Sequence, residues 1–260
     1  MRKFLHFLLA VGVLTLTSCS SMKTKAAEPD RPAIKNLSAR KFSEIISADY
    51  LLFLPKEYSA TDTNRWPLIL FLHGAGERGT NVWRPTIHGP TKYIEKNPDF
   101  PFILVTPLCP EGQKWSDDVV LGILDQVSDK YAVDTNRIYL TGLSMGGYGT
   151  WSLATTYPER FAAVAPICGG EGTIGAVLSL GDKSKAAALK NLPIWAFHGA
   201  KDNVVPVAES ERMVDFLKKS GVKEIKLTIY PEAMHNSWTQ TYDNPDLYKW
   251  FLAHEKKTLK

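Results

Sequence analysis

The chain has 260 residues, a formal charge of +4 at neutral pH, 44% hydrophobic residues and three cysteines. This length suits one α/β domain with a sizeable core, and no internal repeat or low-complexity block indicates a second domain. The charge is too small to indicate binding to nucleic acid or to an anionic membrane surface.

The first residues have the pattern of an export signal. Arg2 and Lys3 precede an apolar stretch over 4–16 that is too short to span a bilayer comfortably. Residues 16–19 read Leu-Thr-Ser-Cys and resemble the lipobox of bacterial lipoproteins. The resemblance implies cleavage before Cys19 and attachment of lipid to its thiol. An ordinary secretory signal with a chance cysteine is the alternative.

These features divide the chain into three expected parts. We expect a signal peptide over 1–18, a flexible tether over 19–38 and one folded domain over 39–260. We then expect the protein to be exported and lipid-anchored to the bacterial cell envelope. Ser20 after the lipid cysteine is compatible with the outer membrane, but it does not indicate which face.

Apolar runs and helical patterns alternate along the rest of the chain. The runs indicate strands buried on both faces, as in parallel sheets. They cover residues 48–54, 68–72, 102–105, 138–141, 161–167, 194–197 and 225–230. Helices are expected over 117–131, 147–157, 208–220 and 246–255. This order predicts an α/β fold with a doubly wound, mostly parallel sheet.

A Gly-Leu-Ser-Met-Gly motif at 142–146 lies between an expected strand and an expected helix. Gly-x-Ser-x-Gly at such a junction is the nucleophile elbow. Only residues without a Cβ can pass close to the serine backbone in this strained turn, which accounts for the glycines. The motif predicts Ser144 as a nucleophile. The alternative is a serine in a glycine-rich loop.

An acid and a base follow two later strands. Doubly wound sheets place their ligands at the carboxyl ends of the strands. Asp202 follows the strand that ends at His198, and His235 follows the last strand. The order Ser, Asp, His is that of α/β-hydrolases. We therefore expect Ser144 to be the nucleophile, His235 the general base and Asp202 the carboxylate that orients it.

The other histidines fit the role of base less well. His73 and His198 each precede a glycine at a strand end, where a histidine more often shapes the turn. His254 falls in the terminal helix. His88, in a loop of undefined position, is therefore the one real rival to His235.

The alternatives to Asp202 are also weaker. Asp182 falls in an irregular segment before the next strand, and Asp215 lies on a helix face. Glu232 and Asp243 flank the expected base on its own loop. Asp182 is therefore the fallback for the orienting acid.

Backbone N–H groups are the expected oxyanion donors. Met145, directly after the nucleophile, supplies one, and the His-Gly-Ala-Gly turn at 73–76 supplies the other from Ala75. A tight strand exit is the alternative interpretation of that turn.

Neither a metal nor a cofactor is expected. No pair of histidine, cysteine or carboxylate residues has the usual ligand spacing. The glycines at 74–79 loosely resemble a phosphate-binding loop, but the acidic residue and helix that such a loop needs are not evident. Cys109 and Cys168 follow different strands, so we expect two free, partly buried thiols, with a disulfide as the alternative.

Five motifs in this order resemble bacterial serine esterases of the α/β-hydrolase superfamily. The likeness is to carbohydrate esterase family 1 and to the so-called predicted peptidases or phospholipase/carboxylesterases, and it extends over 48–252. The motifs are His-Gly-Ala-Gly-Glu-Arg-Gly at 73–79, Pro-Leu-Cys-Pro at 107–110 with Trp115, Gly-Leu-Ser-Met-Gly-Gly at 142–147, Gly-Ala-Lys-Asp at 199–202 and His-Asn-Ser-Trp at 235–238.

The resemblance implies hydrolysis of esters through an acyl-enzyme. Its members commonly release acetyl or feruloyl groups from plant cell-wall polysaccharide. Trp115 and Trp238 lie on the motifs and are expected to form an apolar or sugar-stacking wall, with a place in the core as the alternative. The insertion over 169–191 is short for a lid, and an open cleft suits a polymer chain.

Two other functions remain open from the sequence. A general carboxylesterase or serine peptidase acting on small acyl substrates shares the same three residues and differs in its pocket. A lipid-anchored binding protein with a degenerate hydrolase fold is the non-catalytic alternative, and the intact set of Ser144, Asp202 and His235 argues against it.

Overall fold

The computed structural model describes residues 48–59, 61 and 63–256. The predicted signal peptide over 1–18, the tether over 19–38 and Cys19 lie outside the described residues. No helix in the described part is long and apolar enough to cross a membrane.

One seven-stranded sheet forms the centre of the described domain, in the order β1-β3-β2-β4-β5-β6-β7. The strands are β1 (Tyr50–Phe53), β2 (Trp66–Leu72), β3 (Ile103–Pro107), β4 (Val133–Leu143), β5 (Ala163–Ile167), β6 (Ile194–Gly199) and β7 (Ile225–Tyr230). Only β1 is antiparallel to its neighbour, while β2 to β7 pair in parallel. The predicted α/β fold with a mostly parallel sheet is confirmed, including all seven expected strands.

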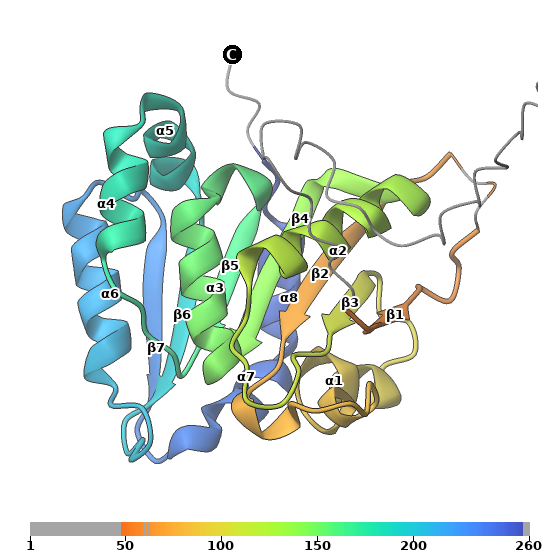
Figure 1. Ribbon diagram of the computed structural model, residues 1–260, viewed down its shortest axis with the longest axis horizontal. Coiled ribbons are helices and arrows are strands. Elements are labelled where there is room, and N and C mark those ends of the chain that lie inside the picture. The colour runs from red at the N-terminus through yellow and green to blue at the C-terminus, as the bar shows by residue number, and fades with distance from the viewer. Residues whose placement is uncertain (1–47, 60, 62, 257–260) are drawn as a thin grey trace, which may run out of the picture. The chain divides into compact units, whose positions relative to one another are not determined.

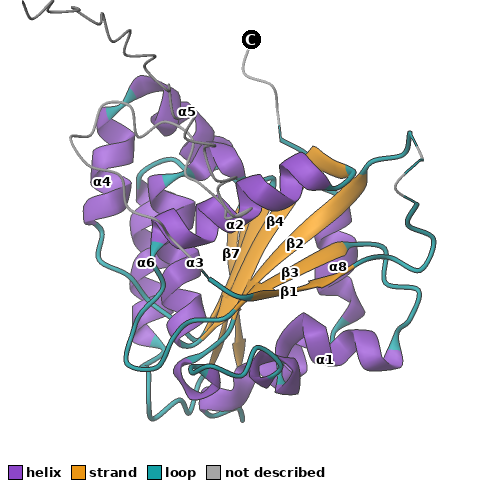
Figure 2. Cartoon of the chain, turned by 45° about the vertical axis from the view of Figure 1, so that its right-hand side comes forward, coloured by secondary structure: helices purple, strands orange, loops and turns teal. Residues whose placement is uncertain are grey.

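Helices cover both faces of the sheet (Figures 1 and 2). The α-helices are α1 (Gly89–Lys96), α2 (Asp117–Lys130), α3 (Met145–Thr156), α4 (Ile174–Gly181), α5 (Lys183–Asn191), α6 (Ala208–Lys219), α7 (Trp238–Tyr242) and α8 (Pro245–Leu252). Short 3₁₀ helices are η1 (Ala75–Glu77), η2 (Arg84–Ile87), η3 (Pro158–Arg160) and η4 (His235–Ser237). One apolar core joins the sheet to α2, α3 and α6, and the other joins it to α1, α7 and α8.

The strand β2 shows why these two cores form. Leu68, Leu70 and Leu72 pack into the first core, whereas Ile69 and Phe71 pack into the second. Successive side chains of a strand point to opposite faces, so an unbroken apolar run needs cover on both sides. The apolar sequence of β2 therefore dictates a sheet between two helical layers.

Four α-helices, α1, α4, α5 and α7, were not expected from the sequence. The segment before β6 was expected to be irregular, and this is wrong because it forms α4 and α5. Asp182 starts α5 by accepting hydrogen bonds from the backbone N–H groups of Ser184 and Lys185, at 2.9 and 3.0 Å. Helix α1 was also missed, since its Gly-Pro start reads as a turn although proline suits the first turn of a helix.

The strand order places two catalytic loops side by side. The chain leaves β2 towards β3 and then crosses back to β4, so β2 and β4 are neighbours whose connections run in opposite directions. Such a switch point opens a crevice at the carboxyl ends of the strands. Leu72 is paired with Gly142, which brings the turn after β2 beside the elbow after β4.

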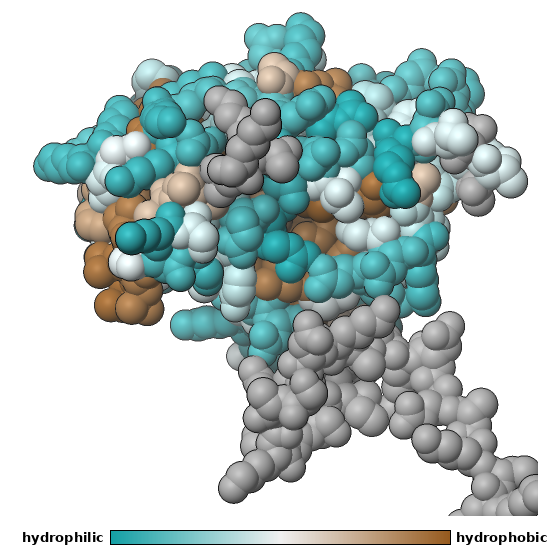
Figure 3. Space-filling model, turned by 90° about the horizontal axis from the view of Figure 1, so that it is seen from above, coloured by the Kyte–Doolittle hydropathy of each residue, from teal (hydrophilic) through white to brown (hydrophobic). Residues whose placement is uncertain are grey.

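The view in Figure 3 looks onto the opposite edge of the sheet, where the parallel strands begin. The visible described surface is mostly hydrophilic, with apolar residues gathered in smaller areas.

Candidate active site

The turn that carries Ser144 is strained. Ser144 has φ +53° and ψ −116°, a conformation that L-residues rarely adopt, and it stands between β4 and α3. A Cβ on Gly142 would lie 2.3 Å from the carbonyl oxygen of Gly146, and one on Gly146 would lie 1.9 Å from that of Leu72. Both glycines of the motif are therefore required by close backbone approach, as expected for a nucleophile elbow.

The structure brings together the three residues singled out by the sequence. His235 Nε2 lies 2.9 Å from Ser144 Oγ, and His235 Nδ1 lies 2.7 Å from Asp202 Oδ2. Because a carboxylate only accepts, Nδ1–H donates to Asp202 and Nε2 is left to accept the serine proton. This is the arrangement that a serine nucleophile and its base require.

Aligned strand ends create this arrangement. Leu143 is paired with Ile167, Ile167 with Phe197, and Gly199 with Tyr230. The loops after β4, β6 and β7 therefore emerge from one edge of the sheet, although they are far apart in the sequence.

Asp202 is held as an anion by several donors. Its side chain is fully buried, and its Oδ1 accepts the backbone N–H groups of Val204 and Val205, each at 2.9 Å. Burial alone would raise its pKa. The hydrogen bonds from His235 and from these two N–H groups outweigh burial, and the pKa lies below its usual value.

A second histidine faces the same carboxylate. His198 is completely buried, and its Nε2 lies 3.3 Å from Asp202 Oδ2 and 2.9 Å from the carbonyl oxygen of Val205. Both partners accept, so Nε2 carries a proton. The other ring nitrogen lies 2.7 Å from Ser210 Oγ. The sequence analysis gave His198 only a role in the turn, and its position four residues before Asp202 was the one available signal.

His73 has a different role at the end of β2. Its Nε2 accepts the backbone N–H of Cys109 at 3.0 Å, so its Nδ1–H donates to the carbonyl oxygen of Gly74 at 2.7 Å. Burial, aided by the nearby charges of Arg78 and Arg84, lowers its pKa from 6.5 to about 4, against the hydrogen bond to Gly74. His73 is thus a neutral clamp between the turn after β2 and the loop after β3.

The two expected oxyanion donors are the first residues of short helical segments. Met145 begins α3 and Ala75 begins η1, and the N–H of a first helical residue has no partner within its helix. Among the described residues, no backbone hydrogen bond outside the helices and strands involves either N–H. Both groups are free to meet a substrate oxygen, at the two loops that the strand order places together.

A hollow of about 480 Å³ opens beside the nucleophile. Ser144, Met145, Tyr148 and Trp115 line it, and Glu171 lies at its border. The indole Nε1–H of Trp115 donates to the carbonyl oxygen of His73 at 3.1 Å, which fixes the ring in the wall. Trp115 also packs against the core, and its role in substrate binding stays a prediction.

Trp238 lines a separate hollow of about 590 Å³ on the far side of His235. Its ring contacts that of His235, with centroids 5.3 Å apart, and packs against the second core. The two tryptophans therefore do not form one wall. Trp115 borders the hollow that Ser144 lines, and Trp238 borders the other hollow and contacts His235.

The rival residues lie away from the nucleophile. His88 precedes α1, and its Nε2 is 3.8 Å from Oε1 of the buried Glu77. Asp182 caps α5 and is exposed. Among the described residues, neither is hydrogen-bonded to Ser144 or His235, and the geometry favours Asp202 over Asp182.

A thiol lies close to this group of side chains. Ligand atoms of Cys168, Asp202 and His235 lie within 4.8 Å of one another, which a metal ion would also need. However, burial raises the pKa of Cys168 to about 12, so its sulfur keeps its proton, and Asp202 and His235 bind each other. These donors fit a hydrogen-bonded relay better than a metal centre. Cys109 and Cys168 are both free and buried, as expected.

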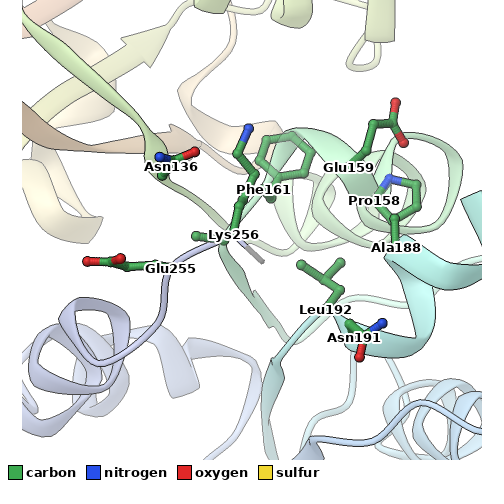
Figure 4. A pocket seen from close by; sticks show the side chains of 10 residues that line it. Asn136, Pro158, Glu159, Phe161, Ala188, Asn191, Leu192, Glu255 and Lys256 are labelled. Carbon is green, nitrogen blue, oxygen red and sulfur yellow. The ribbon is translucent and has the colours of Figure 1, made fainter. Parts of the chain in front are cut away.

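A third hollow, of about 290 Å³, lies at the opposite edge of the sheet (Figure 4). Asn136 at the beginning of β4, Phe161 and Leu192 line it together with Lys256. Burial lowers the pKa of Lys256, and its backbone N–H donates to the carbonyl oxygen of Asn136 at 2.9 Å. This hollow contains none of the expected catalytic residues.

Comparison with known proteins agrees with this geometry. Residues 112–244, half of the chain, match the family described as phospholipase/carboxylesterase. A bifunctional acetylxylan esterase/xylanase of Neocallimastix patriciarum is 30% identical over 152 residues, which are 56% of this chain but only 20% of that protein. A probable feruloyl esterase C of Aspergillus niger is 26% identical over 92% of this chain and 83% of its own length.

Solved structures have the same fold. The crystal structure of a thermostable esterase is 34% identical, with a TM-score of 0.65, over 82% of this chain and 60% of that chain. A ferulic acid esterase, at 19% identity and a TM-score of 0.56, shares the fold. This likeness agrees with the family match over residues 112–244 and with the hydrogen bonds that join Asp202, His235 and Ser144. The chain belongs to the phospholipase/carboxylesterase family of α/β-hydrolases.

Proposed function

We propose that the protein is a serine esterase that hydrolyses carboxylic esters through an acyl-enzyme. One observation carries the proposal, namely the continuous set of hydrogen bonds from Asp202 through His235 to Ser144. A serine hydroxyl is a poor nucleophile until a base takes its proton, and this geometry supplies that base at 2.9 Å.

In the first step, Ser144 Oγ attacks the ester carbonyl while its proton moves to His235 Nε2. The imidazolium that forms is stabilised by the buried anion of Asp202. The N–H groups of Met145 and Ala75 bind the negative oxygen of the tetrahedral intermediate. His235 then returns the proton to the alcohol as the C–O bond breaks, and the acyl group remains on Ser144.

In the second step, water takes the place of the alcohol. His235 removes a proton from the water, the hydroxide adds to the acyl carbon, and the carboxylic acid leaves as Ser144 regains its proton. His198 and the N–H groups around Asp202 keep that carboxylate in place through both steps.

We propose acetyl or feruloyl esters of plant cell-wall polysaccharide as the substrates. The similarity to an acetylxylan esterase and to a probable feruloyl esterase supports this choice. The hollow at Ser144 is open to solvent and bordered by Trp115, which suits an acyl group presented on a polymer better than a buried lipid tail.

A substrate panel tests the proposal on the intact chain. p-Nitrophenyl acetate, methyl ferulate, acetylated xylan and a peptide amide are assayed with the wild-type protein and with Ser144→Ala. We expect release of acetate or ferulate from the polymer and its loss in Ser144→Ala. Activity on p-nitrophenyl acetate alone would leave a general carboxylesterase, cleavage of the amide would favour a peptidase, and no turnover of any substrate would favour the binding-protein alternative.

We further propose that the enzyme is exported and anchored by lipid at Cys19. The Leu-Thr-Ser-Cys sequence before a polar segment supports this assignment. In a bacterial host, Cys19→Ser should move the protein from the membrane fraction to the soluble fraction. An unchanged membrane fraction would rule out the lipid anchor.

A further inference from the structure

The hollow beyond Trp238 has no role in the ester chemistry described above. It lies between α1 and α7, two helices that contact each other at the catalytic edge of the sheet (Figure 1). Its volume, about 590 Å³, is larger than that of the hollow at Ser144. A small ligand site commonly has a volume of roughly 300–1,000 Å³, so this hollow is large enough to hold a sugar residue.

The rings of Trp238 and His235 link this hollow to Ser144. The Trp238 ring contacts His235, which is hydrogen-bonded to Ser144, and it also contacts His88, with ring centroids 5.4 Å apart. His88 and Trp238 both line the hollow. Trp238 therefore both lines the hollow and contacts the catalytic base, so the hollow adjoins the reacting group.

The lining combines aromatic rings with positive charge. Tyr93 and Trp238 offer apolar surfaces of the kind on which a sugar ring stacks. Lys92 and Lys96 stand four residues apart on α1, so both ammonium groups lie on one side of the helix. Both side chains are exposed, and neither forms an ion pair with another described residue.

The nearby carboxylates offset only part of the positive charge of Lys92 and Lys96. Asp243 is the one carboxylate in the lining, against two lysines. The carboxyl group of Glu77 lies behind His88, 3.8 Å from its Nε2, and is buried away from solvent. The remaining polar lining, which includes Asn97 and Thr239, is neutral and offers hydrogen bonds to hydroxyl groups.

From this combination we propose that the hollow is a subsite for a sugar residue that bears a carboxylate, that is, a uronic acid next to the esterified unit. The proposal rests on the polysaccharide esterase function above and narrows its substrate class. Trp238 stacks on the sugar ring, and Lys92 and Lys96 bind the carboxylate. Uronic acids occur as side groups on xylan and as the backbone of pectin, and the subsite chemistry is the same for both.

Binding to the inactive Ser144→Ala protein tests the subsite apart from catalysis. The probes are a glucuronic-acid-bearing xylo-oligosaccharide, an oligogalacturonide and a neutral xylo-oligosaccharide of equal length, measured by calorimetry. We expect an acidic probe to bind about three- to tenfold more tightly than the neutral one, the gain from one or two exposed charge pairs. The acidic probe that binds better identifies the source of the uronic acid.

Charge reversal on α1 tests whether Lys92 and Lys96 cause the preference for the acidic probe. Lys92→Glu/Lys96→Glu should abolish or invert the preference for the acidic probe, whereas the matched control Lys219→Glu, on α6 at the opposite edge of the sheet, should keep it. Lys92→Gln/Lys96→Gln gives the same comparison without added negative charge. Raising the salt from about 0.02 to about 0.5 M should also weaken the preference, because exposed charge pairs are screened.

Each remaining outcome counts against the subsite. Equal binding of acidic and neutral probes would overturn it, as would no binding of any probe, or a preference that survives both double variants. Turnover of p-nitrophenyl acetate by the wild-type protein is measured alongside. If that ester is hydrolysed while the acidic preference is absent, the esterase function stands and only the subsite fails.

Discussion

The carboxyl ends of β2 and β6 are alike in sequence but have different roles in the structure. A histidine followed by a glycine stands at the end of each strand, and both His73 and His198 are completely buried. His73 binds only backbone groups, one donor and one acceptor, and holds two loops together as a neutral ring. His198 instead places its Nε2–H against the carboxylate of Asp202.

The two histidines differ in where their hydrogen-bond partners lie in the sequence. The partner of His73 Nε2 comes from the loop after β3, far away in the sequence. The partners of His198 Nε2 come from its own loop, which turns back so that Asp202 and Val205 reach this side of the ring. We infer that the β2 end sets the shape of the oxyanion turn, while the β6 end fixes the acid of the relay.

Asp202 should affect the rate of ester hydrolysis more than any other described carboxylate. Asp202→Asn keeps the shape of the side chain but removes the anion that stabilises the His235 imidazolium. We expect kcat on p-nitrophenyl acetate to fall by about 10⁴-fold. A loss of less than about tenfold would show that another acid orients His235.

His198 should act on rate through Asp202. His198→Phe keeps a ring in the cavity but removes the N–H that faces Asp202 and Val205, so we expect kcat to fall by about 10- to 100-fold with little change in KM. Combining it with Asp202→Asn should add almost nothing, since residues that act as a unit are not additive. Full additivity of the two changes would indicate a merely structural role.

His73 should act on stability and its dependence on pH. The unfolded chain protonates this histidine below its usual pKa of 6.5, whereas the folded protein resists protonation until about 4. Its stabilising effect is therefore complete above pH 6.5 and is lost as the pH falls towards 4, by about 3 kcal/mol.

Urea unfolding at pH 7 and pH 4 measures this effect. The wild-type protein should lose more free energy of unfolding between the two pH values than His73→Asn does. Identical losses in both proteins would mean that His73 is not held neutral by the fold. The variant should also lower kcat, because the turn that carries Ala75 loses its clamp.

The smallest effect concerns Asp182, the fallback acid. Asp182→Ala removes the cap of α5 and should reduce the free energy of unfolding by about 1 kcal/mol. Ester hydrolysis should stay unchanged, in contrast to Asp202→Asn. A large fall in kcat would return Asp182 to consideration as the orienting acid.

The sequence was sufficient for the sheet and for the residues around Ser144. Apolar runs predict buried strands, and the glycines around Ser144 predict a backbone turn, because both depend on local pattern. The helices α4 and α5 were not predicted, although Asp182 directly before Lys183 and Ser184 is a readable cap. The second partner of Asp202 was also missed, because the contact of His198 depends on how a loop folds back.

The two tryptophans show a further limit of sequence analysis. Both were expected near the cleft, and both are there. Only the structure shows that Trp115 and Trp238 border two separate hollows, because α1 was not predicted and supplies one wall of the second. The lysines of that wall therefore had no place in the sequence interpretation.

The central claim is that Asp202 and His235 activate Ser144 as the nucleophile. Labelling with a serine-directed phosphonate, followed by mass mapping of the modified peptide, tests it most directly. We expect one phosphonyl adduct, located on Ser144, that forms in step with loss of esterase activity and forms far more slowly in Asp202→Asn and His235→Ala. An adduct on another residue, or full activity in the Ser144-labelled protein, would contradict it.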